Sequence, residues 1–135
     1  MPTLRIATIL ASLALAGCAK ATAIPVAANM VRITTDAAQM CGATGAQSVA
    51  SKQAAIETIR RGYDGYVITA GDHDKTTSFS YNAYGGGSST QHHQSLLVKM
   101  YRTGEPGSEN AISAQQQLGP EWRKIASEGQ ITCLG

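Results

Sequence analysis

Several absences narrow what this chain can be. Its 135 residues include only 11 basic and 9 acidic side chains, for a formal net charge of +2. A nucleic-acid-binding domain needs a basic surface, which this composition does not supply. No apolar run reaches the length of about 18–20 residues that spans a bilayer as a helix, and no internal repeat is present. These absences exclude nucleic acid as a partner, and the length fits one domain.

Apolar residues are concentrated at the N-terminus. Residues 1–17 contain 11 apolar side chains out of 17, whereas all seven aromatic residues lie between Tyr63 and Trp122. Arg5 is the only charge before an apolar stretch at residues 6–16. A short basic start, a short apolar core and small residues at its end are typical of a signal peptide. We therefore predict that residues 1–17 are removed on export.

The signal segment ends in Leu15-Ala16-Gly17-Cys18. This motif resembles the lipobox of bacterial lipoproteins at all four positions. The resemblance implies that the Cys18 thiol receives a diacylglyceryl group, that the peptide is cut before it, and that the new amino group is acylated, for example with palmitate. The alternative is an ordinary secretory signal followed by an incidental cysteine.

The resemblance also implies a location. Each buried methylene contributes about 0.8 kcal/mol to membrane binding, so a multi-chain anchor holds a protein permanently. The residue after Cys18 is Ala19 rather than aspartate, and in the enteric lipoproteins that difference favours the outer membrane over the inner one. We expect a lipid-anchored protein on the periplasmic side, with the membrane as its first partner.

The odd number of cysteines has a simple explanation if Cys18 carries lipid. Cys41 and Cys133 remain, 92 positions apart, and an oxidising periplasm permits them to form a disulfide. In the chain-entropy model a loop of this length contributes roughly 4–5 kcal/mol. Two free thiols, or a redox-active pair without C-x-x-C spacing, are the alternatives.

The sequence of the mature chain predicts a short tether followed by one domain. Residues 18–29 contain the cysteine expected to carry lipid, followed by small, alanine-rich residues and Pro25. This composition predicts a tether, and residues 30–135 are expected to form the domain. Apolar periodicity predicts a helix over 45–61, preceded by a capping box at Thr44 and Gln47. The other expected elements are strands 30–34, 66–70, 76–81, 94–101 and 130–134, a turn at 71–75 and a Gly/Ser-rich loop at 82–91. Two further helices are expected, one capped by Ser108 or Asn110 and running to Leu118, and one over 120–127.

These elements occur in the order β-α-β-β-β-α-α-β. Such a mixture predicts an α+β fold, a small mostly antiparallel sheet with helices packed on one face.

Two groups of residues are candidates for binding. His73 and the His92-His93 pair are potential ligands for zinc or copper, although adjacent residues on a strand point to opposite faces, so only one of the pair can join. The simpler interpretation is that these histidines belong to exposed polar clusters, and we expect no metal or other cofactor. Near the Gly/Ser-rich loop, Tyr81, Tyr84 and Tyr101 are candidate contacts for a glycan or protein partner, with packing inside the domain as the alternative.

Sequence motifs for catalysis are absent. There is no G-x-S-x-G elbow and no phosphate-binding G-x-x-x-x-G-K pattern, and we predict that the protein is not an enzyme. A hydrolase would require a deep polar pocket. The expected function is a non-catalytic binding or structural role with an envelope protein as partner; metal or small-ligand binding through His73 and one of His92 and His93 is the alternative.

The mature part has its own distant resemblance. The segments SVASKQAAIETIR and GYVITA are similar in type and order to those of the Rcs stress-sensor lipoprotein domain. That domain has four cysteines where this chain has two, so its signalling role is not carried over. MCGATGAQ, RRGYDGYVI and LGPEWRKI also resemble segments of small uncharacterised proteobacterial lipoproteins, a likeness that implies no particular activity.

Overall fold

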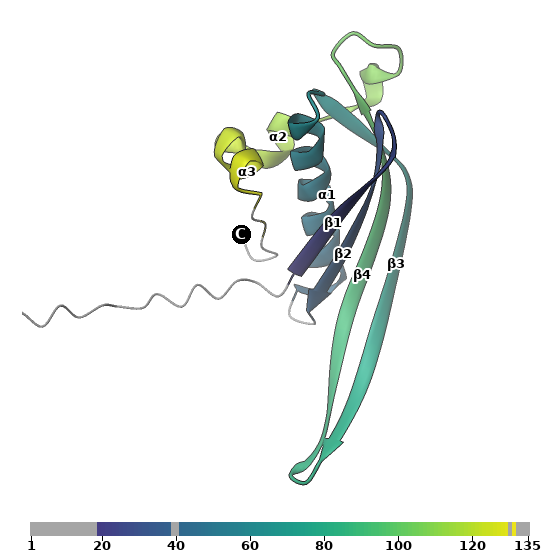
Figure 1. Cartoon of the computed structure of the whole chain (residues 1–135), viewed down its shortest axis with the longest axis vertical. Helices are drawn as coiled ribbons and strands as arrows, with labels where there is room; N and C mark the ends of the chain where they lie inside the picture. Colours follow the sequence, from purple (N-terminus) through teal and green to yellow (C-terminus); the bar gives the residue numbers. More distant parts are fainter. Residues whose placement is uncertain (1–18, 39–40, 130, 132–135) are drawn as a thin grey trace, which may run out of the picture.

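A computed structural model describes residues 19–38, 41–129 and 131 of the chain. It contains one antiparallel five-stranded sheet in the order β1-β2-β4-β3-β5, with the helices on one face (Figure 1). The predicted α+β class, with a mostly antiparallel sheet and helices packed on one face, is confirmed. The strands are β1 (Ala19–Ala27), β2 (Met30–Ala38), β3 (Gly65–Asn82), β4 (Gly85–Tyr101) and β5 (Ile112–Ser113); the helices are α1 (Gly42–Arg60), α2 (Ala114–Leu118) and α3 (Trp122–Glu128).

The core lies between α1 and the middle of the sheet. Val31 on β2 is paired with Val98 on β4, and Ile33 with Leu96, so these side chains share the face that α1 covers. All four are buried, and each fully buried aliphatic side chain contributes about 1.5–3 kcal/mol. The predicted alternation on β4 is therefore confirmed at its buried positions.

Helix α1 presents a stripe of small and branched residues to the sheet. Ala46, Val49, Ala55 and Ile56 are buried, as their helical spacing predicts. The small alanines let the helix approach the sheet closely. The predicted capping box is wrong: the helix begins at Gly42 with Cys41 as its N-cap, and that cap residue makes no side-chain hydrogen bond to the helix.

Tyr66 joins the start of β3 to the helix. Its side chain is fully buried, and its Oη donates a hydrogen bond to the Ser51 carbonyl oxygen at 3.1 Å. Burial disfavours the charged phenolate and raises the pKa of Tyr66 to about 12. The neutral hydroxyl therefore persists well above the pH at which an exposed tyrosine ionises.

The segment predicted as a tether is a strand. Residues 19–27 form β1, which pairs with β2 from Ala19↔Ala37 to Ala27↔Met30. Pro25 lacks a backbone N–H, but β1 is the edge of the sheet, where a missing donor is tolerated. Residues 19–27 therefore belong to the folded domain, for which the sequence predicted a start at residue 30.

Strands β3 and β4 are much longer than predicted. The expected turn at 71–75 is wrong, because β3 continues through it after a bulge between Ile68 and Ala70. The expected loop at 82–91 is also wrong, since β4 begins at Gly85 and pairs with β3 along its whole length. Backbone hydrogen bonds between the two strands extend the ladder without help from side-chain patterning.

The C-terminal helices close the far side of α1. Arg60 Nε donates a hydrogen bond to the Ala126 carbonyl oxygen at 2.7 Å, which ties α3 to the end of α1. Gly129 ends α3 in the left-handed conformation with φ 67°, as its position predicts. The last predicted strand, 130–134, lies outside the described residues apart from Ile131, which packs against the core. Within the described ranges, no helix has the length and apolar character needed to cross a membrane.

Candidate functional site

The most distinctive surface is a hairpin that extends past the rest of the sheet. Strand β2 ends at Ala38, which pairs with Gln91 of β4. Beyond that row, among the residues that the structure describes, only β3 and β4 pair with each other, from Thr77↔Thr90 to Asn82↔Gly85. We call residues 77–90 the arm. Figure 1 shows it projecting from the end of the sheet, past all the helices that the structure describes.

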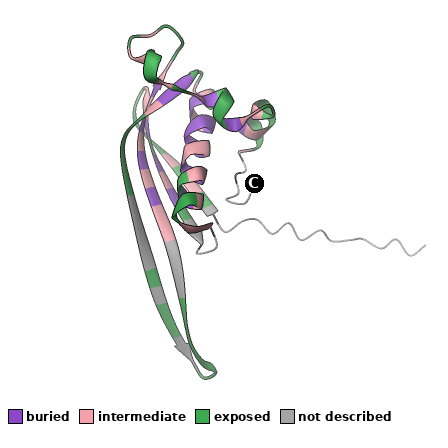
Figure 2. Cartoon of the chain, turned by 180° about the vertical axis from the view of Figure 1, so that it is seen from behind, coloured by how far each residue is buried: buried purple, intermediate pink, exposed green. Residues whose placement is uncertain are grey.

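The arm is exposed and uncharged. Residues 76–91 contain no Asp, Glu, Lys or Arg. Phe79 is 71% exposed and Tyr84, in the turn at the tip, is 99% exposed. No described side chain of the arm is buried (Figure 2). Large aromatic side chains usually lie in cores, so two of them on a projecting, uncharged hairpin indicate a contact surface.

One edge of the arm also continues an open sheet edge. Strand β5 pairs with β3 only at Gly65 and Tyr66, and beyond these no other strand covers that side of β3 in the described ranges. An uncovered edge offers backbone N–H and C=O groups to a partner. Charged residues that would discourage pairing are missing from the arm itself.

The three tyrosines predicted to bind a partner do not form one group. Tyr84 lies at the tip of the arm, whereas Tyr101 ends β4 at the opposite end of the sheet. Tyr101 packs over Gly107, where φ is 94° and an added Cβ would lie 2.9 Å from the ring. Tyr101 is therefore a packing residue, the alternative stated above. The side chain of Tyr81 lies outside the described residues.

The histidines occupy the base of the arm. Strand alternation places His92 and His93 on opposite faces of β4, as expected. His93 Nδ1 contacts Asp36 Oδ1 on the neighbouring strand β2. The backbone of His73 pairs with Gln94, but its side chain lies outside the described residues. Among the side chains that are described, no three His, Cys, Asp or Glu residues are grouped to hold a metal ion, so metal binding stays a prediction.

The cysteine predictions fall mostly outside the described residues. Cys18 and Cys133 are not described, nor are residues 1–17. Cys41 is disulfide-bonded, and no other cysteine belongs to the described ranges. The pairing of Cys41 with Cys133 and the lipidation of Cys18 stay predictions.

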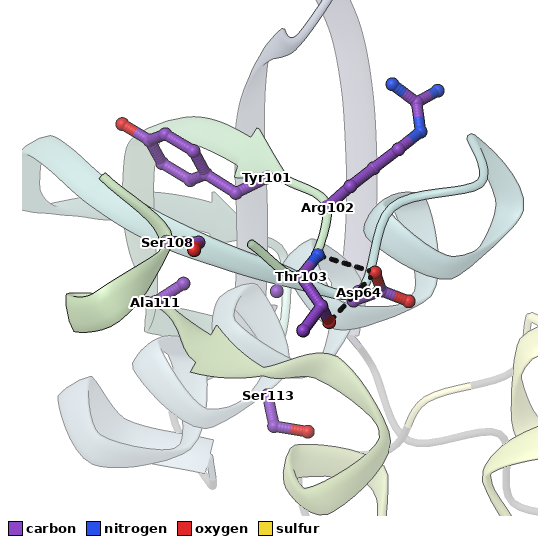
Figure 3. A pocket seen from close by; sticks show the side chains of 8 residues that line it. Asp64, Tyr101, Arg102, Thr103, Ser108, Ala111 and Ser113 are labelled. Carbon is purple, nitrogen blue, oxygen red and sulfur yellow. Dashed lines mark hydrogen bonds between the residues drawn. The ribbon is translucent and has the colours of Figure 1, made fainter. Parts of the chain in front are cut away.

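A pocket of about 170 Å³ lies where β3 begins and β4 ends, at the end of the sheet opposite the arm. Figure 3 shows the side chains that line it. Its carboxylate, Asp64, accepts hydrogen bonds from the Thr103 backbone N–H at 2.8 Å and from Thr103 Oγ1 at 3.1 Å. The Arg102 guanidinium lies over the Tyr63 ring, 4.4 Å from its centre. These polar groups hold the loop after β4 in place, which makes the pocket a structural feature.

A second depression, of about 220 Å³, lies on the uncovered face of the sheet. The bulge in β3 shapes it, and Arg32, Asp72 and Ser95 contribute its polar atoms. Arg32 and Asp72 are exposed, so their charges are solvated and attract a ligand only weakly. Neither depression offers as clear a binding surface as the arm.

Comparisons with known protein families, characterised proteins and solved structures found no match. The arm is thus interpreted from its own residues. Sequence reasoning missed Phe79, because alternating bulky residues predicted a half-buried strand. The sequence did contain one indication of this surface: residues 76–91 include no charged side chain. In the structure they form one continuous hairpin and not the predicted strand followed by a loop.

Proposed function

We propose that the protein is a lipid-anchored lipoprotein of the cell envelope, located at the outer membrane and facing the periplasm, with a non-catalytic binding role. The motif Leu15-Ala16-Gly17-Cys18 after a short apolar stretch supports the anchor. The binding role is assigned to the arm, residues 77–90.

The exposed aromatic side chains of the arm carry this proposal. Phe79 and Tyr84 are accessible on a hairpin that no other described element covers. A hairpin of this kind adds little to the core, yet it exposes apolar area that favours association. Other exposed apolar side chains lie elsewhere on the domain: Ile24 is on the edge strand β1, paired with Arg32, and Ile112 is at the opposite end of β3.

The anchor is tested by replacing the cysteine that carries it. In cells supplied with labelled palmitate, Cys18→Ser is expected to abolish incorporation of label, because serine has no thiol to accept the diacylglyceryl group. Cys41→Ser, the matched control, retains the label. Labelling of Cys18→Ser at the wild-type level would overturn the lipoprotein assignment.

The binding role is tested by photo-crosslinking in cells. A photoreactive amino acid at Tyr84 is expected to give a discrete adduct with an envelope protein or a phospholipid, detected as a change in mass. The same amino acid at Ile112, which is 41% exposed at the opposite end of β3, serves as the control. Equal and diffuse labelling at both positions would show that the arm is not a specific contact surface.

A further inference from the structure

The start of β1 places the proposed lipid at the same end of the sheet as the arm. Cys18 is bonded to Ala19, and consecutive Cα atoms are about 3.8 Å apart. Ala19 belongs to a row of paired residues that crosses four strands, from Ala19 through Ala37 and His92 to Lys75. The arm begins two residues beyond Lys75. No tether separates the attachment point from this row.

The arm reaches well past the attachment row. Asn82, the last paired residue of β3, lies seven positions beyond Lys75, which at about 3.3 Å per residue corresponds to about 23 Å. Strand β1 runs away from Cys18 while the arm extends in the opposite direction (Figure 1). An acyl chain on Cys18 would hold this end of the domain against the bilayer and bring the arm to the membrane surface.

We propose that the arm is a second membrane contact, with Phe79 and Tyr84 inserted among the lipid headgroups of the bilayer that receives the lipid of Cys18. This inference rests on the proposed lipidation. The composition of the arm is compatible with the headgroup region of a bilayer. It carries no charge that would have to be desolvated, and aromatic rings favour the interface between water and hydrocarbon.

The backbone limits how deep the arm can lie. The outer edge of β3 is uncovered beyond Tyr66 among the described residues, and unpaired backbone groups are costly in hydrocarbon. A two-stranded hairpin therefore rests in the headgroup region, where water and lipid oxygens satisfy its edges, and does not span the membrane. Because the lipid already holds the domain at the surface, the local concentration of the arm is high and a weak contact suffices.

Charged residues lie at the base of the arm, including Asp36, Asp74 and Lys75, but none belongs to the arm itself. The opposite end of the sheet, beyond Gly65 and Tyr101, carries charged side chains in its loops, including Asp64, Arg102 and Glu105. With the uncharged arm at the bilayer, these groups lie on the side away from the membrane, in water. A second copy of the chain paired along β3 is the competing occupant, and the experiment separates the two.

The test measures contact between the arm and lipid in the full lipidated protein. The chain has one tryptophan, Trp122, so Trp122→Phe/Tyr84→Trp places the single reporter at the tip. The protein is reconstituted in vesicles of phosphatidylethanolamine and phosphatidylglycerol, with and without lipids brominated near the headgroup. Trp122→Phe/Ile112→Trp is the matched control, and Trp122→Phe/Phe79→Trp is a second reporter on the arm. Circular dichroism confirms that each variant is folded.

Brominated lipid is expected to remove most of the emission at positions 84 and 79 and to leave emission at position 112 nearly unchanged. Equal emission with and without bromine at both arm positions would overturn the proposal, and chemical crosslinking between copies under those conditions would assign the arm to self-association. Mass analysis of the N-terminal peptide shows separately whether Cys18 is acylated. Unacylated protein contradicts the proposed function, whereas acylated protein without quenching contradicts the membrane contact alone.

Discussion

Replacing Ile56 with alanine is expected to lower the free energy of unfolding by about 2–5 kcal/mol. Ile56 is fully buried where α1 packs on the sheet. Truncation removes apolar contacts and leaves a cavity that the rigid strands behind it fill only partly. Domains of this size are stable by about 5–15 kcal/mol, so the loss is a large part of the total.

Ile24→Ala is the matched control for this experiment. Ile24 has the same side chain but is 53% exposed on the edge strand β1, and an exposed substitution usually changes stability by no more than about 0.5 kcal/mol. Urea unfolding of the mature domain, followed by circular dichroism, measures both changes. Equal losses at the two positions would mean that the core does not lie between α1 and the sheet.

Removal of the predicted disulfide is expected to lower stability by roughly 4–5 kcal/mol, because a bond between Cys41 and Cys133 would close a loop of 92 positions in the unfolded chain. Cys41 is disulfide-bonded at the N-cap of α1. The bond would tie the start of that helix to the C-terminal end of the chain. Without it the unfolded chain gains conformational freedom, and the folded state is left with a much smaller margin.

Thermal unfolding of Cys41→Ser, Cys133→Ser and the double variant measures this effect. If the two cysteines form one bond, each single variant loses as much stability as the double variant, since the bond is lost in all three. Peptide mapping of the wild-type protein under non-reducing conditions identifies the linked pair. Additive losses, or two freely alkylated thiols in the wild type, would contradict the pairing.

The parts of the fold that could be predicted from the sequence are those with one buried face. Helix α1 has buried residues at helical spacing, such as Val49 and Ile56, and β4 alternates through Leu96, Val98 and Met100. Burial imposes a period on the sequence, and the period identifies the element. The α+β class follows from these elements together.

The candidate site could not be predicted in the same way. The arm has no buried face, so its side chains carry no clear alternation, and its glycines and serines predict a loop. Its strands exist because β3 and β4 are paired along their whole length. The positions of Tyr84 and Tyr101 at opposite ends of β4 depend on that same pairing.

The sequence by itself determined the fold class, the buried face of α1 and the alternating core of β4, because each depends on a local pattern of apolar residues. Only the tertiary structure decided that residues 19–27 form an edge strand, that β3 and β4 extend into a free arm, and that this arm projects from the end of the sheet where β1 begins. Those features arise from backbone hydrogen bonds between paired strands, β1 with β2 and β3 with β4. Such bonds can form whatever the side chains are, so no apolar pattern in the sequence announces them.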